Sequence, residues 1–127
     1  MRRVLIASLL CIVALTIPIH AEDLKGKATV YSLSGKTATG TDTRYGICAS
    51  GNKELLGKYV ILYQRLPDYR KGECLGIFSV EDTGCKKDVI DIWCPAEWQK
   101  MIIDKTYENG CNGKIYIQVV EQERRMK

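Results

Sequence analysis

Polar and apolar residues alternate along several short stretches of this chain, the pattern of β-strands that bury one face. These stretches are rich in Val, Ile, Thr, Tyr and Trp, which favour strands. Six strands are predicted in this way: residues 27–33, 45–49, 58–63, 76–84, 89–93 and 114–120. A Gly- and Thr-rich polar loop at 34–43 follows the first strand, and a hairpin tip at 67–72 follows the third.

One segment before the last strand, residues 95–105, changes to a helical period. Pro95 suits the first position of a helix, where its missing N–H has no partner to lose. Trp98, Met101 and Ile102 share one helical face. We expect this stripe to pack against the sheet, as such stripes usually do.

Six short strands and one helix within about 95 residues favour a small closed barrel, because closure removes the exposed strand edges. A sandwich of two sheets is the alternative, and the spacing of the strands does not choose between the two. The chain is too short for more than one domain with a core of its own.

The first 21 residues have the pattern of a secretory signal peptide. A basic pair, Arg2-Arg3, precedes an apolar core at residues 4–17, and Ile19-His20-Ala21 forms a cleavage site. We expect residues 1–21 to be removed and 22–127 to form a single secreted domain with no stable insertion in the membrane. A retained membrane anchor is the alternative.

Charge argues against a nucleic-acid partner. Removal of Arg2 and Arg3 takes two of the 19 Lys and Arg residues, which leaves a small excess over the 15 Asp and Glu residues. The sequence shows no basic face interleaved with aromatic residues, so we expect no nucleic acid to bind. A slight positive charge suits an anionic cell-wall polymer, among other partners. A monomer is expected.

Five cysteines follow the predicted signal peptide: Cys48, Cys74, Cys85, Cys94 and Cys111. Export permits disulfides, and an odd number leaves at least one thiol unpaired. The spacing contains no C-x-x-C, which removes the usual redox motif and the common zinc knuckle. We expect one bridge between Cys85 and Cys94, a second among the other three cysteines, and one leftover thiol.

The single histidine, His20, lies in the predicted signal peptide. Ser-His-Asp and Cys-His mechanisms need an imidazole base, and catalytic zinc sites usually need an imidazole ligand. We therefore expect no metal and no cofactor. If the mature protein is an enzyme, carboxylates are the expected proton handlers.

Two aspartates are the candidates for this role. Asp91 lies between Ile90 and Ile92, where partial desolvation raises the pKa of a carboxyl group, and an ionised Asp82 nearby acts in the same direction. Asp82, at a strand end, is better placed to accept hydrogen bonds. The simpler alternative is that Asp82 only forms a turn and that Asp91 points to solvent.

Several short motifs recur in a fixed order along the chain, and they resemble those of the three-aspartate ("3D") domain of bacterial cell-wall proteins. That domain is similar to the catalytic barrel of membrane-bound lytic transglycosylase A. The resemblance extends from about Thr29 to Val120. The motifs are Thr29-Val30-Tyr31, Thr37-Ala38-Thr39-Gly40, Gly46-Ile47-Cys48-Ala49, Leu56-Gly57-Lys58-Tyr59-Val60, Asp82-Thr83-Gly84 and Ile90-Asp91-Ile92-Trp93.

The resemblance implies a mainly β fold, a small six-stranded double-psi β-barrel with one short helix before the last strand. It also implies cleavage of the β-1,4 bond between N-acetylmuramic acid and N-acetylglucosamine in peptidoglycan, with Asp91 as the acid/base and Asp82 in support. The substrate-binding residues expected from it are Thr39, Gly40, Thr83 and Gly84. Thr39 and Gly40 alternatively belong to a plain connection between strands.

Two departures from the family pattern bear on this expectation. Ser50 stands where the first of the three aspartates is expected, and the loop between the other two is about two residues shorter and contains Cys85. A different class of function therefore stays open, a non-catalytic binder of cell-wall polysaccharide like the expansins and barwins. A third is a secreted inhibitor or toxin-like domain that uses the barrel only as a scaffold.

Overall fold

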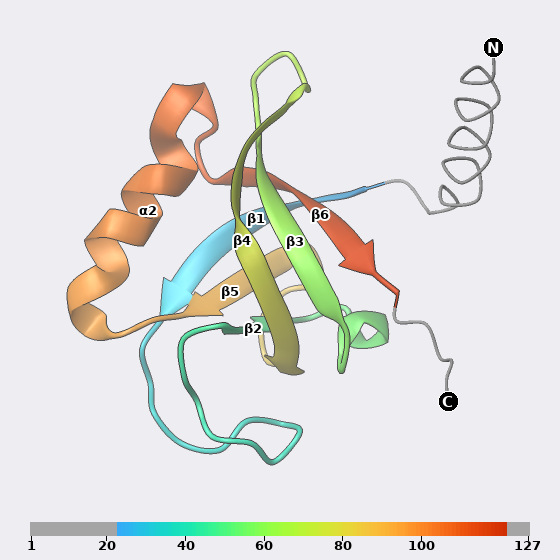
Figure 1. The fold of residues 1–127 in the computed structure, drawn as a ribbon, viewed down its shortest axis with the longest axis vertical. Coiled ribbons are helices and arrows are strands. Elements are labelled where there is room, and N and C mark those ends of the chain that lie inside the picture. Colours follow the sequence, from blue (N-terminus) through green and yellow to red (C-terminus); the bar gives the residue numbers. More distant parts are fainter. Residues whose placement is uncertain (1–22, 122–127) are drawn as a thin grey trace, which may run out of the picture.

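Six strands close into one barrel in the computed structural model of the protein, which describes residues 23–121 (Figure 1). The strands are β1 (Leu24–Tyr31), β2 (Ile47–Ser50), β3 (Tyr59–Arg65), β4 (Lys71–Asp82), β5 (Val89–Trp93) and β6 (Lys114–Val120). Their order around the barrel is β1-β5-β2-β4-β3-β6, with β6 pairing back to β1. Closure leaves no strand with an unpaired edge.

The barrel is mixed: β1 is parallel to β5 and β2 is parallel to β4, whereas the other four pairs are antiparallel. Parallel partners need long crossover connections, so the strands that pair in parallel lie far apart in the sequence. The predicted mainly β fold, a small six-stranded barrel with one short helix before the last strand, is confirmed. The two-sheet sandwich is not formed.

All six predicted strands are present, and the bounds of β6 agree with the prediction. The largest difference is at β4, which begins at Lys71 instead of residue 76. Its first residues are mostly polar and lie at the hairpin with β3, where Arg65 pairs with Lys71 and Tyr63 with Cys74. Backbone pairing across the hairpin extends the strand beyond the part with an apolar face, so the hydrophobic pattern does not reveal it.

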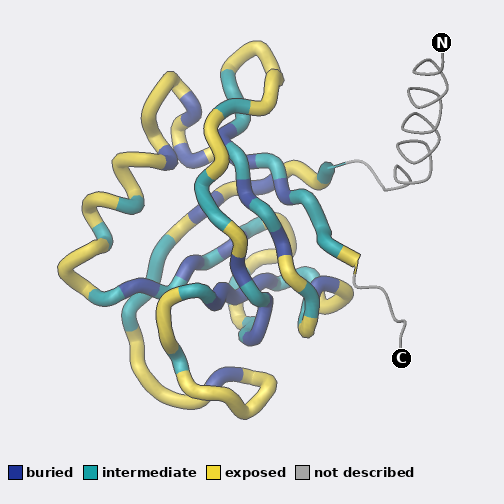
Figure 2. The backbone as a smooth tube through the Cα atoms, in the orientation of Figure 1, coloured by how far each residue is buried: buried dark blue, intermediate teal, exposed yellow. Residues whose placement is uncertain are grey.

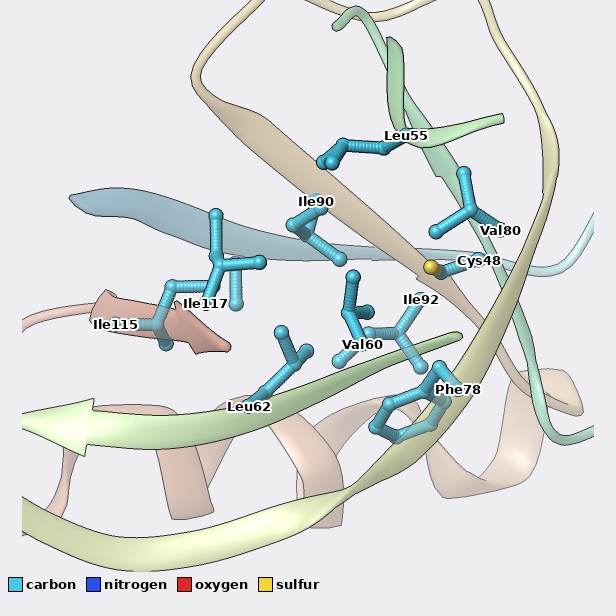
Figure 3. Close-up of a cluster of buried hydrophobic side chains, with 11 residues drawn as sticks. Cys48, Leu55, Val60, Leu62, Phe78, Val80, Ile90, Ile92, Ile115 and Ile117 are labelled. Carbon is cyan, nitrogen blue, oxygen red and sulfur yellow. The ribbon is translucent and has the colours of Figure 1, made fainter. Parts of the chain in front are cut away.

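The core lies inside the barrel, and Figure 2 shows buried positions recurring along the strands. Successive side chains of a strand point to opposite faces, so alternate residues face the core. Burial of one such side chain contributes about 1.5–3 kcal/mol. Figure 3 shows the cluster, to which every strand contributes: Ala28, Cys48, Leu55, Val60, Leu62, Phe78, Val80, Ile90, Ile92, Ile115 and Ile117.

The helical segment consists of a 3-10 turn at Ala96–Trp98 (η2), the helix α2 (Gln99–Tyr107) and a second 3-10 turn at Glu108–Gly110 (η3). The prediction that Trp98, Met101 and Ile102 all pack against the sheet is largely wrong. Ile102 packs against the core, but Trp98 is 40% exposed and Met101 is 60% exposed. The helix is short and the barrel closes its own core, so only a narrow part of the helix is covered; Trp98 contacts Tyr45 edge-on, with ring centroids 5.3 Å apart.

The prediction of a disulfide between Cys85 and Cys94 is wrong. All five cysteines among residues 23–121 are free thiols. Cys85 and Cys94 lie at opposite ends of β5, and five extended residues span about 16 Å, whereas the Cα atoms of a disulfide lie within about 7 Å. Cys48, Cys94 and Cys111 are buried and fill space as small apolar side chains.

The predicted signal peptide, residues 1–21, and the end of the tail, residues 122–127, lie outside the described residues. Over residues 23–121, no helix has the length and apolar character needed to cross a membrane.

Candidate functional site

Strand pairing brings the two candidate aspartates to the same place on the barrel. Ala49 of β2 is the register partner of Asp82 on β4 and also of Asp91 on β5. Asp82 and Asp91 are therefore on strands that have only β2 between them. Because neighbouring strands are about 4.8 Å apart, the two aspartates lie close together on the barrel. Both aspartates are half-buried, and Ala49 is 3% exposed.

A β-bulge decides which acidic residue of β4 takes this position. Cys48 pairs with Val80, but the next residue, Ala49, pairs with Asp82, so Glu81 is an extra residue without a partner on β2. A bulge of this kind redirects side chains locally. Asp82 consequently lies level with Asp91, and the Glu81 side chain is used elsewhere.

Asp91 is on the outward side of β5, because its neighbours Ile90 and Ile92 point into the core. Its Oδ1 accepts a hydrogen bond of 2.7 Å from Oγ1 of Thr29, its register partner on β1. Burial raises the pKa of the Asp91 carboxyl above its ordinary value; the Thr29 hydrogen bond opposes this, and the charge of Asp82 adds to it. A carboxyl group with a raised pKa can carry the proton that an acid catalyst needs.

Asp82 accepts hydrogen bonds from three sides. Its Oδ1 accepts from the backbone N–H of Ala38 and of Thr83, both at 3.0 Å, and its Oδ2 accepts from the hydroxyl of Tyr31 at 3.3 Å. Ala38 belongs to the long loop between β1 and β2, so Asp82 ties that loop to the end of β4. The carboxylate is thereby held in one orientation.

Tyr31 links the two aspartates electrostatically. The pKa of its hydroxyl is raised far above the ordinary value. Burial is the main cause, and the charge of Asp82, the hydrogen bond to Asp82 and the charge of Asp91 raise the pKa further. The hydroxyl therefore keeps its proton at every physiological pH. It acts in the site as a neutral donor toward Asp82.

Glu81 anchors the rest of the β1–β2 loop. Its two carboxylate oxygens accept one hydrogen bond each, of 2.8 Å, from the two terminal nitrogens of Arg44, and Oε1 also accepts from the hydroxyl of Thr41. These contacts lower the pKa of Glu81 to about 2, although burial of the carboxylate acts in the opposite direction. The hydrogen bond from Arg44 makes the largest contribution. The backbone N–H of Thr39 donates to the Glu81 carbonyl oxygen, so the loop is fixed at the rim of the site.

The four predicted substrate-binding residues lie around Asp82. Thr39 and Gly40 follow Ala38 in the anchored loop and are exposed; Thr83 and Gly84 follow Asp82 directly. Gly40 and Gly84 have φ angles of 88° and 110°, and a Cβ at either would meet open space. Thr39, Gly40 and Gly84 are exposed and Thr83 is half-buried, so the four residues lie at the rim beside the Asp82 carboxylate.

Ser50 has a structural task. Its side chain is buried, and Oγ accepts a hydrogen bond of 3.0 Å from the N–H of Asn52 at the turn after β2. The next residue is Gly51, where a Cβ would lie 2.2 Å from the carbonyl oxygen of Cys85. The β4–β5 loop thus packs directly on this turn, and the Cys85 thiol points to the carbonyl oxygen of Val89 at 3.5 Å.

Four residues of the site have no role that the sequence pattern predicts: Thr29, Tyr31, Arg44 and Glu81. Thr29 and Tyr31 alternate on the outward side of a predicted strand, but this pattern gives no sign of their partners, which lie 62 and 51 positions away, respectively. Arg44 and Glu81 likewise come together only through the crossover. No group of three or more His, Cys, Asp or Glu side chains among residues 23–121 is arranged to hold a metal ion.

Comparison with known proteins gives no relative: no family model, no curated protein and no solved structure matches the chain.

Proposed function

We propose that the protein is a secreted, peptidoglycan-cleaving enzyme of the lytic transglycosylase kind, which acts on the β-1,4 bond between N-acetylmuramic acid and N-acetylglucosamine. The observation that carries the proposal is Asp91, a half-buried outward carboxyl group whose pKa is raised by burial and by Asp82. The proposal of secretion rests on the pattern of residues 1–21.

In the proposed reaction, Asp91 donates its proton to the glycosidic oxygen as the bond to the muramyl anomeric carbon breaks. The 6-hydroxyl of the same muramyl residue then forms a bond to that carbon, and the Asp91 carboxylate takes the hydroxyl proton. The products are a free 4-hydroxyl and a 1,6-anhydro end. No water is consumed, so a second carboxylate to activate water is not needed.

The surrounding residues have supporting roles in this proposal. Asp82 keeps the Asp91 proton in place through its negative charge and fixes the loop that carries Thr39 and Gly40. Thr29 orients the Asp91 carboxyl through its hydrogen bond. Thr39, Gly40, Thr83 and Gly84 offer hydrogen-bonding groups to the sugars at the rim.

One observation favours a second candidate, a binder of cell-wall polysaccharide that does not cleave it. Ser50 replaces a family aspartate, and its hydroxyl is committed to the turn at Asn52. A binder would retain peptidoglycan without releasing products. Product analysis therefore separates the two candidates.

The test is digestion of purified peptidoglycan followed by mass spectrometry, with Asp91→Asn as the variant. Asparagine keeps the shape and can accept the Thr29 hydrogen bond, but it cannot supply the proton. General acid–base catalysis contributes about 10²- to 10⁴-fold, so release of anhydro-muropeptides should fall by at least about 10²-fold. Asp88→Asn is the matched control, since Asp88 is an exposed aspartate in the loop before the same strand.

Asp82→Asn should lower the rate less than Asp91→Asn, because Asp82 acts through its charge and the loop it holds. A folded Asp91→Asn protein that releases anhydro-muropeptides at the parent rate would remove the catalytic assignment. Binding of peptidoglycan by the parent protein without any product would favour the binder.

A further inference from the structure

Three tyrosines on one side of the barrel each have a cation against the ring: Tyr63 on β3, Tyr116 on β6 and Tyr69 at the tip of the β3–β4 hairpin. The ammonium of Lys71 lies 4.4 Å from the ring centroid of Tyr63, that of Lys25 lies 5.8 Å from the ring of Tyr69, and the guanidinium of Arg65 lies 5.8 Å from the ring of Tyr116. Energetically significant cation–π pairs occur about once per 70–80 residues in proteins, so three on one face are a concentration. We call this surface the tyrosine–lysine face.

Strand register gathers these residues from distant parts of the chain. Tyr116 on β6 is the partner of Tyr63 on β3 and of Lys25 on β1, so the three form one row across the barrel. Lys27 and Lys114, which pair with each other, form the next row. Hydrophobic and charge patterns along the sequence do not reveal this face, because its members come from β1, β3, β4, the hairpin tip and β6.

Three lysines of this face are available to a partner. Lys25, Lys27 and Lys114 are exposed, and none of the three forms a salt bridge with another residue in the range 23–121. Lys71 and Arg65 differ: Lys71 pairs with Asp23 at 2.8 Å, and Arg65 donates hydrogen bonds to the carbonyl oxygens of Ile115 and Gly26. Tyr69 is 66% exposed at the hairpin tip, where its carbonyl oxygen accepts a hydrogen bond from the hydroxyl of Tyr116.

The face is continuous with the candidate site. Lys25, Lys27 and Thr29 alternate on the outward side of β1, and Thr29 bonds to Asp91. Thr29 is four positions after Lys25 in the extended strand, a distance of about 13 Å. A polymer bound at Asp91 and aligned with β1 would pass over Lys27 and reach Lys25 and Tyr69.

We propose that the tyrosine–lysine face is a second binding surface for an acidic glycan strand, occupied by the part of the polymer that extends beyond the cleaved bond. The identity of the polymer rests on the proposed function. Lysines bind carboxylates along the strand, and flat, amphipathic tyrosine rings suit the apolar faces of sugars. Nucleic acid is the other polyanion that such a surface could attract, but a partner aligned with β1 would place its phosphates against Asp91 and Asp82, which disfavours it.

The experiment measures binding, separately from cleavage, by co-sedimentation with insoluble peptidoglycan in the Asp91→Asn background. The variant is Lys25→Gln/Lys27→Gln, and the charge-matched control is Lys53→Gln/Lys100→Gln on elements away from the face. A lysine close to an anionic surface contributes about a factor of five, so the first pair should weaken binding about tenfold or more, with a shallower salt dependence. The control pair should change binding by less than about twofold.

Neutral chitin and single-stranded oligo(dT) serve as competing probes, and both should compete poorly with peptidoglycan. Equal loss in the two double variants, or oligo(dT) binding as tight as peptidoglycan, would overturn the proposal. If Asp91 proves irrelevant to cleavage, the proposed reaction fails while the binding comparison still decides the role of this face.

Discussion

The hydroxyl of Tyr31 donates a hydrogen bond to Oδ2 of Asp82, although the strands β1 and β4 that carry these residues are not neighbours in the barrel. Two strands, β5 and β2, lie between them in the strand order. These strands carry Asp91 and its register partner Ala49, respectively. The contact therefore connects opposite sides of the candidate site, and it makes the site a network of four strands instead of a pair of exposed carboxylates.

Tyr31→Phe removes only this hydroxyl. The free energy of unfolding at pH 7 should fall by about 1 kcal/mol, the usual net contribution of one hydrogen bond. Tyr59→Phe is the control, since Tyr59 is 46% exposed and its hydroxyl has no hydrogen-bond partner in the described part of the chain. Urea denaturation measures both, and equal stability of the two variants would show that the Tyr31 bond contributes nothing.

Glu81→Gln should make the protein less stable at neutral pH but not in strong acid. The Arg44 ion pair lowers the pKa of Glu81 to about 2 from an unfolded value of 4.5. Its stabilising effect is fully present above the unfolded pKa and is lost as the pH falls toward 2. Because the Arg44 side chain is half-exposed, we expect a loss of about 2 kcal/mol at pH 7.

The check on this prediction is urea denaturation at pH 7 and near pH 2.5, with Asp68→Asn as the control. Asp68 pairs with Arg70 on the exposed hairpin tip, where such pairs contribute little. A difference between Glu81→Gln and the parent that persists unchanged at the lower pH would contradict the electrostatic explanation.

Asp91→Asn should raise stability at neutral pH, in contrast to its expected effect on activity. The folded pKa of Asp91 is raised above the unfolded value of about 3.9, so its ionisation disfavours the folded state as the pH rises past that value. The variant lacks this penalty, so its advantage should be present at pH 7 and absent below about pH 4. A variant that is less stable than the parent at pH 7 would argue against the raised pKa.

Thiol labelling should follow burial and not a disulfide pattern. Cys74 is exposed and should react first with a maleimide, and the half-buried Cys85 should follow. Cys48, Cys94 and Cys111 should react only after unfolding, and burial also raises the pKa of the Cys48 thiol to about 12, which suppresses its thiolate. Mass spectrometry of the labelled peptides measures the order; a disulfide found within residues 23–121 would contradict the structure.

The sequence by itself determined the strands, the place of the helix and the environment of Asp91. Alternation along residues 89–93 puts Ile90 and Ile92 inside, so Asp91 must face outward between buried neighbours, and its desolvation follows from that local pattern. Six short strands that need their edges covered predict closure. These properties depend on residues that are close together in the chain.

The tertiary structure alone decided the partners. Crossover connections set the parallel pairs β1–β5 and β2–β4, and the bulge at Glu81 places Asp82, not Glu81, opposite Ala49. The tyrosine–lysine face and the Thr29–Asp91 bond likewise depend on register between distant strands. Hydrophobic periodicity shows which side of a strand is buried but contains no information on which strand lies next to it, because every strand with one apolar face fits the same core.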